Sequence, residues 1–330
     1  MESEKKIVVI GGSGFVGSRL LLELDENKCI NFDKRPSPFY NQITKTLDIR
    51  FKEHIQLPKT AKVVILLAAE HRDDVSPVSL YYDVNVKGTK NVLDKMDDQG
   101  INHLVFTSTV AVYGLNKHNP DETHLLDPFN HYGKTKYEAE KLIRKWYEKD
   151  SKNRSVSIIR PTVIFGERNR GNVHNLLKQI CSRKFLMIGD GQNMKSMAYV
   201  GNVAAFIKDR VEKTEAGYRV FNYADKPDYN MTDLVAFIEK TINIKTPKIK
   251  IPYWLGILGG YTIDVFAKFS RKKLPISSIR VKKFCATTQF DASKAQTCFD
   301  PPFTIEQGLK KTIEYEFINP KQDDVLFFSE

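Results

Sequence analysis

Cysteine is scarce in this sequence of 330 residues, and its four positions follow no recurring spacing. Cys29, Cys181, Cys285 and Cys298 form no CxxC pair and have no neighbouring pair of histidines. We therefore expect neither a disulfide framework nor a zinc site, and no other bound metal. Free thiols are typical of a reducing compartment, so we expect a cytoplasmic protein.

Long uninterrupted hydrophobic runs are also absent. The one long apolar tract, residues 251–269, contains a proline, three glycines and two charged residues. A membrane-spanning helix is therefore not expected. Near the N-terminus two lysines precede an apolar stretch, but Gly11 and Gly12 end it too early for the core of a signal peptide. That stretch is typical of a first β-strand.

Acidic residues are too few to balance the basic ones. The chain has 51 Lys and Arg against 40 Asp and Glu, a formal net charge of +11. This surplus favours an anionic partner, which is nucleic acid, an acidic membrane surface or a phosphorylated small molecule. No nucleic-acid-binding module is visible. The basic cluster Arg271–Lys273 is consistent with weak contact to a membrane surface, although a solvated helix end is the commoner explanation.

Short β-branched runs alternate with helical patterns in the first half of the chain. This alternation predicts an α/β fold with a doubly wound parallel sheet. Strands are expected at Lys6–Ile10, Cys29–Phe32, Lys62–Ala68, His103–Thr107 and Val156–Arg160. Helices are expected at Phe15–Asp25, around Tyr81–Met96 and at Tyr132–Glu148.

After Pro161 the alternation weakens and the loops lengthen. We expect residues 1–165 to form mainly a cofactor-binding domain. Residues 166–330 would form mainly a smaller, discontinuous substrate lobe, with short segments that return to the first domain. Two helices are predicted in this lobe, one over Met231–Ile242 capped by Asn230 or Thr232, and one over Phe303–Ile318.

A glycine-rich turn, residues 11–17, joins the first strand directly to the first helix. Glycines there permit a tight turn and close approach of a pyrophosphate to the helix N-terminus. At the end of the second strand, Asp33 is placed to accept hydrogen bonds from an adenosine ribose and to repel a 2′-phosphate. This favours NAD over NADP, although Lys34 and Arg35 beside it argue the other way.

Tyr132 and Lys136 lie four residues apart on a predicted helix, so their side chains share one face. A nearby ammonium favours a phenolate, so the lysine is expected to lower the pKa of the tyrosine. Three hydroxyl-bearing residues, Thr107, Ser108 and Thr109, follow a predicted strand at the edge where ligands bind in such sheets.

Together these motifs resemble the extended short-chain dehydrogenase/reductase family, and within it the NAD-dependent nucleotide-sugar epimerase/dehydratase branch typified by UDP-glucose 4-epimerase. The resemblance covers most of the chain and implies a Rossmann domain. Its motifs are the GxxGxxG turn, Asp48-Ile49-Arg50, Leu67-Ala68-Ala69, the NVxGTxN segment 85–91, YxxxK at 132–136, Arg160-Pro161-Thr162-Val163 and the C-terminal segment 294–309.

The resemblance implies roles for individual residues. Tyr132 would be the general acid/base, Lys136 would hold the nicotinamide ribose, and Thr109, with Ser108 as its neighbouring candidate, would be the catalytic hydroxyl. NAD would contact Gly11, Gly14, Phe15, Val16, Gly17, Asp33, Asp48, Ile49, Leu67, Ala68, Ala69, Thr107, Tyr132, Lys136, Pro161 and Val163. The substrate would contact His71, Thr109, Asn172, His174, Asn175, Lys195 and Arg280.

The same resemblance narrows the reaction. Dehydratases of this branch have T-D-E-V-Y-G where this chain has Val110 and Ala111 after Thr109, so 4,6-dehydration is disfavoured. C4 epimerisation of a nucleotide sugar, most commonly a UDP-sugar, for surface polysaccharide precursors and reduction of a 4-keto sugar both remain open. A steroid-type dehydrogenase and a non-catalytic NAD(P) sensor are further alternatives. The resemblance also implies a homodimer.

Overall fold

The computed structural model describes residues 6–72, 75–270 and 278–328. A sheet of seven parallel strands forms its centre, in the order β11-β6-β5-β4-β1-β2-β3. The strands are β1 (Lys6–Ile10), β2 (Cys29–Asp33), β3 (Thr44–Thr46), β4 (Ala61–Leu66), β5 (His103–Thr107), β6 (Ser155–Pro161) and β11 (Gly217–Tyr223). The predicted doubly wound parallel sheet is confirmed.

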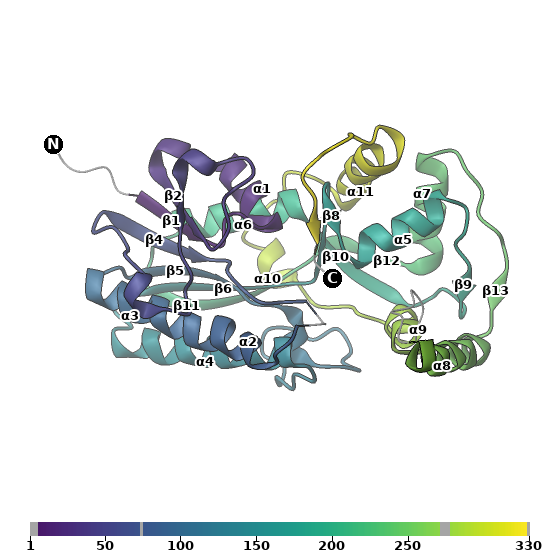
Figure 1. The fold of residues 1–330 in the computed structure, drawn as a ribbon, viewed down its shortest axis with the longest axis horizontal. Coiled ribbons are helices and arrows are strands. Elements are labelled where there is room, and N and C mark those ends of the chain that lie inside the picture. The colour runs from purple at the N-terminus through teal and green to yellow at the C-terminus, as the bar shows by residue number, and fades with distance from the viewer. Residues whose placement is uncertain (1–5, 73–74, 271–277, 329–330) are drawn as a thin grey trace.

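Helices cover both faces of this sheet (Figure 1). Alternate side chains of β1 face opposite sides, because successive residues of a strand point to opposite faces. Val8 and Ile10 belong to the core beneath α3 and α4, whereas Ile7 and Val9 belong to the core beneath α1 and α6. The helices are α1 (Phe15–Glu23), α3 (Thr89–Gln99), α4 (His131–Lys149) and α6 (Val200–Glu212). Both faces are thus buried, as the apolar strand sequences predict.

Two predicted helices of this domain have different bounds in the structure. The first ends at Glu23 rather than Asp25, because the Asp25 side chain caps a separate 3₁₀ turn, Glu26–Lys28. The helix expected around Tyr81–Met96 begins as α2 (Ser79–Tyr82), passes through a π-helical turn, Asp83–Gly88, and continues as α3.

The second lobe has its own small sheet and its own core. Strands β7 (Val163–Phe165), β10 (Met194–Tyr199) and β12 (Asp225–Asn230) form the sheet. Three helices pack on it, α5 (Asn172–Cys181), α7 (Met231–Thr241) and α11 (Ile305–Ile313). The cap of α7 is Asn230, whose side chain accepts from the Asp233 amide, and Thr304 with Gln307 forms a capping box on α11.

Several segments from late in the chain return toward the large sheet. Helix α6 and strand β11 belong to it, although they follow residue 166. The last described strand, β14 (Phe327–Phe328), pairs with β8 (Asn169–Arg170) between the two lobes (Figure 1).

The outer end of the second lobe holds two strands and two helices, β9 (Met187–Ile188), β13 (Lys250–Ile251), α8 (Tyr253–Ser270) and α9 (Ser278–Cys285); α10 (Ser293–Gln296) lies beside β11. Among the described residues, no helix is long and apolar enough to cross a bilayer. All four cysteines are free thiols. The Arg271–Lys273 cluster lies outside the described residues.

Candidate active site

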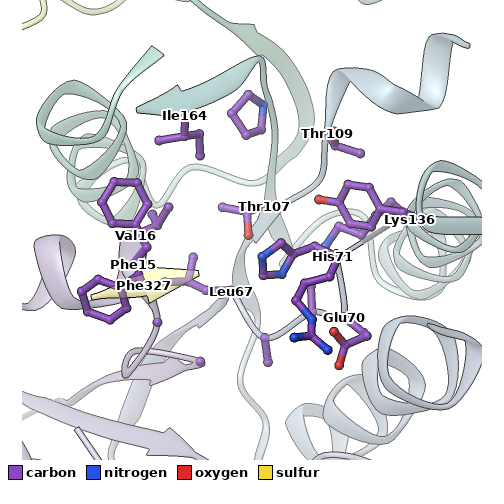
Figure 2. A pocket seen from close by; sticks show the side chains of 18 of the residues that line it. Phe15, Val16, Leu67, Glu70, His71, Thr107, Thr109, Lys136, Ile164 and Phe327 are labelled. Carbon is purple, nitrogen blue, oxygen red and sulfur yellow. The ribbon is translucent and has the colours of Figure 1, made fainter. Parts of the chain in front are cut away.

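One large cavity, about 930 Å³, lies at the carboxyl ends of β1, β4 and β5 and reaches the second lobe. Its floor is the place where the strand order reverses, since β1 pairs with β2 on one side and with β4 on the other. In open α/β sheets, ligands bind at such a switch point. Figure 2 shows side chains from both halves of the chain that point into this cavity.

The glycine turn brings the backbone close to this cavity. Gly11 has φ +93°, and a Cβ there would lie 2.4 Å from the Ala68 nitrogen. A Cβ on Gly17 would lie 2.4 Å from the Gly12 Cα. No side chain caps the N-terminus of helix α1, so its first backbone amides have no side-chain acceptor and stay available at the cavity wall. A pyrophosphate fits this arrangement, because helix N-terminal amides bind anions.

Asp33 lies at the end of β2 on the same cavity wall. Its carboxylate accepts hydrogen bonds from the Ser13 amide at 3.0 Å and the Arg35 amide at 3.0 Å. The carboxylate is thereby fixed beside the glycine turn, in the position from which it would accept hydrogen bonds from a ribose diol in a dinucleotide site. Its negative charge there disfavours a 2′-phosphate.

Two asparagines of segment 85–91 hold the loops around the cavity. Asn85 accepts from the Glu70 amide at 2.8 Å and donates to the Thr135 hydroxyl at 3.0 Å, which ties the loop after β4 to α4. Asn91 donates to the Ile49 carbonyl at 2.9 Å. Asn85 uses both abilities of its amide, to accept and to donate, whereas Asn91 uses its NH2 group as a donor.

Every residue that the sequence analysis assigned to the cofactor lines this one cavity. They are Gly11, Gly14, Phe15, Val16, Gly17, Asp33, Asp48, Ile49, Leu67, Ala68, Ala69, Thr107, Tyr132, Lys136, Pro161 and Val163. The cavity therefore gathers residues from seven separate segments of the chain at one edge of the sheet.

Tyr132 lies in the first turn of α4, which Asn130 starts by accepting from the Gly133 amide at 2.9 Å. Its hydroxyl group hydrogen-bonds with Thr109, which lowers its pKa, but burial outweighs this and raises the pKa of Tyr132 to about 12. The expectation that Lys136 lowers this pKa is therefore wrong for the ligand-free protein. The desolvation of a phenolate is the stronger effect.

Lys136 is buried one helical turn after Tyr132, and its ammonium lies 4.1 Å from the centre of the Phe106 ring. Burial lowers the pKa of Lys136 to about 7, against the opposing charge of Glu140. The phenol and the amine thus both lie where burial disfavours their charged forms. Such a pair is typical of a proton-transfer site.

Ser108 and Thr109 have different surroundings. The Ser108 hydroxyl donates to Glu140 at 2.5 Å, inside a buried network in which Glu140 also binds Arg160 at 2.6 Å. Thr109 instead hydrogen-bonds with Tyr132 and faces the cavity. Of the two candidates, Thr109 is the one that the structure places beside the tyrosine hydroxyl.

The sequence analysis missed Glu140, although its position four residues after Lys136 is a readable signal on a helix. Arg160 was recognised there as part of a motif, but no role was predicted for its side chain. The Arg160 guanidinium donates to the Tyr113 hydroxyl at 2.8 Å, and Tyr113 donates to Asn222 at 2.7 Å. This network ties α4, β6 and β11 together behind the hydroxyls of Thr109 and Tyr132.

Carboxylates line the cavity at its dinucleotide end. Among the described lining residues, the acidic ones are Asp33, Asp48 and Glu70. Asp48 is held by the Arg50 guanidinium, which lowers the pKa of that carboxyl, and Glu70 lies 3.8 Å from the Lys34 ammonium. Next to Thr109 the lining residues are Val110 and Ala111. The described cavity wall directly after Thr109 therefore offers no carboxylic acid for dehydration.

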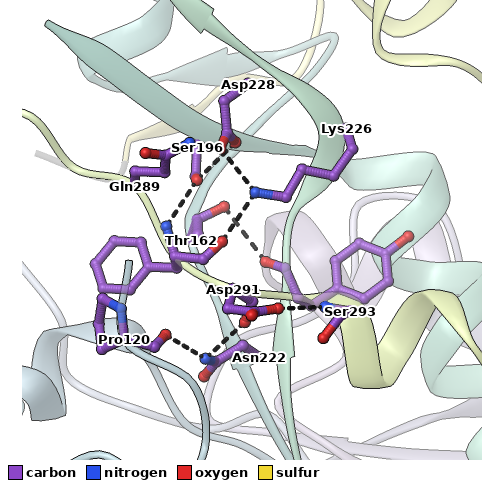
Figure 3. Close-up of polar contacts among 11 residues, drawn as sticks. Pro120, Thr162, Ser196, Asn222, Lys226, Asp228, Gln289, Asp291 and Ser293 are labelled. Carbon is purple, nitrogen blue, oxygen red and sulfur yellow. Dashed lines mark hydrogen bonds and ion pairs between the residues drawn. The ribbon is translucent and has the colours of Figure 1, made fainter. Parts of the chain in front are cut away.

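The second lobe closes the cavity with Ser196, Thr288 and Phe290. A polar network fixes this wall (Figure 3). Ser196 donates to Asp228 at 2.7 Å and accepts from the Phe290 amide at 3.1 Å, while Lys226 bridges Asp228 and the Phe290 carbonyl. The far wall of the cavity is thus built from three separate segments of the lobe.

The predicted substrate residues fall into two groups. His71, Thr109 and Asn172 line the cavity. His174 does not, because its ring packs on Phe317 with centroids 5.4 Å apart, and Asn175 is exposed on α5. Lys195 lies beside the cavity wall but donates to the Ala286 carbonyl at 2.6 Å. Arg280 lies in α9, and its side chain is outside the described atoms.

The C-terminal strand also lines the cavity, which nothing in the sequence indicated. Leu326, Phe327 and Phe328 belong to its wall. The Phe327 ring lies 5.9 Å from that of Phe15 at the start of α1. A two-residue strand near the end of a chain carries no periodic signal, so only the folded structure could place it here.

The sequence profile of the family described as "NAD dependent epimerase/dehydratase family" matches residues 7–224. The chain belongs to this family. It is an enzyme, its cofactor is NAD, and the resemblance read from its motifs is confirmed.

Individual relatives extend the comparison over nearly the whole chain. An Escherichia coli O157:H7 protein named N-acetyl-alpha-D-glucosaminyl-diphospho-ditrans,octacis-undecaprenol 4-epimerase is 57% identical over 98% of this chain and 99% of its own. The yeast (Saccharomyces cerevisiae) sterol-4-alpha-carboxylate 3-dehydrogenase is 29% identical over 96% of this chain and 99% of its own. The solved structure of a Bacillus cereus UDP-glucuronic acid 4-epimerase with NAD has TM-score 0.70 at 22% identity, covering 94% of this chain and 98% of its own.

NAD fits the residues of this member of the epimerase/dehydratase family. A Cβ on Gly11 or Gly17 would meet the backbone of Ala68 or Gly12, so these glycines allow the tight turn and the close packing of α1, while Gly14, which has no Cβ, leaves the backbone open to a pyrophosphate. Asp33 stands at the ribose end, and Lys136 stands with Tyr132 at the other end of the cavity. The buried amine of Lys136 is the group placed to hold the second ribose.

Proposed function

We propose that this protein is an NAD-dependent 4-epimerase of a sugar carried on a diphosphate. The observation that carries the proposal is the hydrogen-bonded pair of Tyr132 and Thr109 above Lys136 in a dinucleotide cavity. Val110 and Ala111 beside that pair leave the chemistry to oxidation and reduction at one carbinol carbon. The 57% identical relative, which is named as a 4-epimerase, supports the same reaction.

In this proposal the chain supplies the proton chemistry. The neutral amine of Lys136 takes the phenol proton of Tyr132. The resulting phenolate removes the proton from the sugar O4, and Thr109 holds that oxygen and the tyrosine oxygen together. Bound NAD would supply the acceptor for the C4 hydride and then its donor to the opposite face of the turned sugar. The Lys136 ammonium formed with the Tyr132 proton stabilises the phenolate, which burial alone disfavours. Tyr132 then returns its proton to O4.

We infer that the substrate is a sugar linked through diphosphate to a polyprenol. The support is the substrate in the name of the 57% identical relative, which matches 98% of this chain. The nucleotide sugar expected from the sequence shares the diphosphate and the sugar, so both substrates present the same reacting groups to Tyr132. A UDP-sugar is accordingly the competing substrate in the test.

Two other activities compete with this proposal. A 4-ketosugar reductase would use the same residues once, with an exchangeable reduced cofactor. A sterol dehydrogenase is supported by the 29% identical yeast protein. An NAD sensor without catalysis is disfavoured, because the Tyr132 and Lys136 pair is intact and lies in the cavity.

The test is a substrate comparison with purified protein and no added reductant. We expect interconversion of polyprenyl-diphosphate-linked N-acetylglucosamine and N-acetylgalactosamine, and slower or no turnover of the UDP-linked sugars. Faster turnover of the UDP-sugars would assign a nucleotide-sugar substrate. Stoichiometric consumption of reduced cofactor with a 4-keto sugar, or turnover of sterols alone, would overturn epimerisation.

Three further statements are part of this proposal. We place the enzyme in the cytoplasm, in the synthesis of surface polysaccharide precursors, and as a homodimer. The first is supported by four free thiols, and the second by the substrate named for the relative. The dimer is a prediction that the mass of the protein in solution will test.

A further inference from the structure

The outer side of α8 carries a continuous row of exposed apolar side chains, which we call the α8 face: Tyr253, Trp254, Leu255, Leu258 and Tyr261. Trp254, Leu258 and Tyr261 follow one another at helical spacing, with 67%, 53% and 48% of their surfaces exposed. The opposite side of the helix packs through Gly256, where a Cβ would lie 2.5 Å from Ile188. An exposed apolar patch of this kind marks an interaction site.

Almost all of the surplus positive charge lies in the same part of the chain. Residues 245–283 contain ten Lys or Arg and one Asp, a balance of +9 out of +11 for the whole protein. Lys245, Lys248 and Lys250 are exposed just before α8, and Lys282 donates to the Tyr261 hydroxyl at 3.0 Å. Lys248 also pairs with Glu239 and Lys250 donates to the Asp190 carbonyl, so among the described residues Lys282 is the lysine in contact with this face. An apolar helix face within a strongly basic segment is typical of a helix that lies on an anionic lipid surface.

The α8 face is also connected to the active site. Lys195, next to the cavity-lining Ser196, donates to the carbonyls of Lys283 and Ala286 at the C-terminal end of α9. Helix α9 packs directly against α8, since the Val281 side chain lies 3.6 Å from the Cβ position of Gly256. Figure 1 shows α8 at the outer edge of the second lobe, with α9 between it and the rest of the protein.

We propose that the α8 face docks the enzyme on an anionic lipid bilayer and so presents the cavity to a substrate whose polyprenyl chain stays in that bilayer. The second half of this statement rests on the proposed function. A second copy of the chain is a poor occupant of the same face, because a two-fold contact would bring two segments of +9 together. Anionic lipid supplies the opposite charge and an apolar interior.

Tryptophan fluorescence tests the docking directly. The chain has two tryptophans, Trp146, which is 3% exposed in the core, and Trp254 on the α8 face. With vesicles of phosphatidylglycerol and phosphatidylcholine we expect a blue shift of the emission, quenching by brominated lipid, and binding that weakens with salt. Trp254→Phe should still bind but lose the shift. Absence of vesicle binding, or an unchanged shift in Trp254→Phe, would overturn the proposal.

Two double variants distinguish binding through the α8 face from nonspecific binding through other exposed apolar side chains. Trp254→Glu/Leu258→Glu should reduce vesicle binding by ~10-fold or more, because two anchors become anionic. Leu22→Glu/Leu125→Glu, at positions 60% and 77% exposed elsewhere, is the matched control and should bind as the wild type does. Equal binding by both variants would contradict the proposal. So would a change of oligomeric state in the first variant without loss of vesicle binding.

Two substrates distinguish failure of docking from failure of the proposed function. Trp254→Glu/Leu258→Glu should epimerise a water-soluble, short-chain prenyl-diphosphate sugar at the wild-type rate, and the undecaprenyl form in vesicles much more slowly. If the wild type binds vesicles but epimerises neither substrate, docking stands and the proposed function is wrong. If the wild type epimerises the short-chain substrate but does not bind vesicles, the proposed function stands and the docking proposal is wrong.

Discussion

Tyr132 and Lys136 show how burial alone prepares two groups for proton transfer. Burial raises the pKa of Tyr132 to about 12 and lowers that of Lys136 to about 7, so each group is held near its neutral form. Transfer of the Tyr132 proton to the Lys136 amine therefore creates a phenolate and an ammonium at a position where burial weakens their screening by water. There the ammonium of Lys136 acts on the phenolate more strongly than it would in water.

Replacement of Tyr132 by phenylalanine tests its assignment as the acid/base. Tyr132→Phe should lower kcat by about 10²–10⁴-fold, because the group that exchanges the O4 proton is lost. NAD binding, measured by calorimetry, should stay within a few-fold. Tyr137→Phe, on the same helix but outside the described cavity wall, is the control and should keep full activity. Retained turnover in Tyr132→Phe would refute the assignment.

The lowered pKa of Lys136 makes a prediction about stability. Between the folded value of about 7 and the ordinary value of 10.5, the unfolded chain holds one more proton than the folded chain, so stability rises with pH across this window. The burial penalty is therefore largest at and below pH 7.

Lys136→Met removes this penalty along with the activity. Without NAD, its Tm should exceed that of the wild type by a few degrees at pH 6, and the gap should shrink by pH 9. Lys134→Met, at an exposed position on the same helix, should show no such trend with pH. A pH-independent difference in Lys136→Met would show that the amine is not held neutral by burial.

For single residues, the sequence predicted which residues belong to motifs, but it did not predict which side chains they contact. Tyr132, Lys136 and Thr109 could be named because their types and spacing are readable. That Ser108 belongs to the Glu140 network, and that His174 packs on Phe317, depends on side-chain contacts between distant segments. No linear pattern specifies such contacts.

At the scale of elements, the first helix depends on two glycines in different ways. Gly17→Ala would place a Cβ 2.4 Å from the backbone of Gly12, so α1 would have to move away from β1. We expect a clear loss of Tm and of NAD affinity. At Gly14 the nearest atom to a Cβ lies at 3.5 Å, so Gly14→Ala should leave Tm almost unchanged. Equal Tm for both variants would contradict this geometry.

The buried ion pair between Glu140 and Arg160 joins α4 to β6 behind the site. Both side chains are 5% exposed, so Glu140→Ala would leave an unpaired buried guanidinium, at a cost of about 3–5 kcal/mol. Glu138→Ala on the same helix breaks only the exposed pair with Lys141 and should cost less than about 1 kcal/mol. Urea unfolding of both variants measures the difference. Similar small losses would mean that the network does not join the two elements.

The positions of strands were more predictable than the ends of helices. β1 and β5 have the bounds that the sequence predicts, because strands buried on both faces need continuous apolar runs. The π-helical turn at Asp83–Gly88 was not predicted, since Asn85 and Gly88 are fitted to the loops at Glu70 and Ile49. Tertiary packing decides such features.

At the scale of the whole molecule, the net charge of +11 is unevenly distributed. Outside residues 245–283 the basic and acidic residues nearly balance, so the dinucleotide domain needs little excess charge to hold NAD. Glycine amides and the N-terminus of α1 would hold the NAD phosphates instead. The charge was visible in the sequence, but the exposed apolar helix beside it appears only in the fold.

The central claim is that C4 of the sugar is oxidised and reduced again by one tightly held NAD, with Tyr132 moving the O4 proton. A substrate deuterated at C4 tests it most directly. We predict that the epimerised product keeps its deuterium at C4, with no hydrogen taken from solvent and no net consumption of cofactor. Loss of the label to water, or hydrogen supplied by added reduced cofactor, would contradict this account.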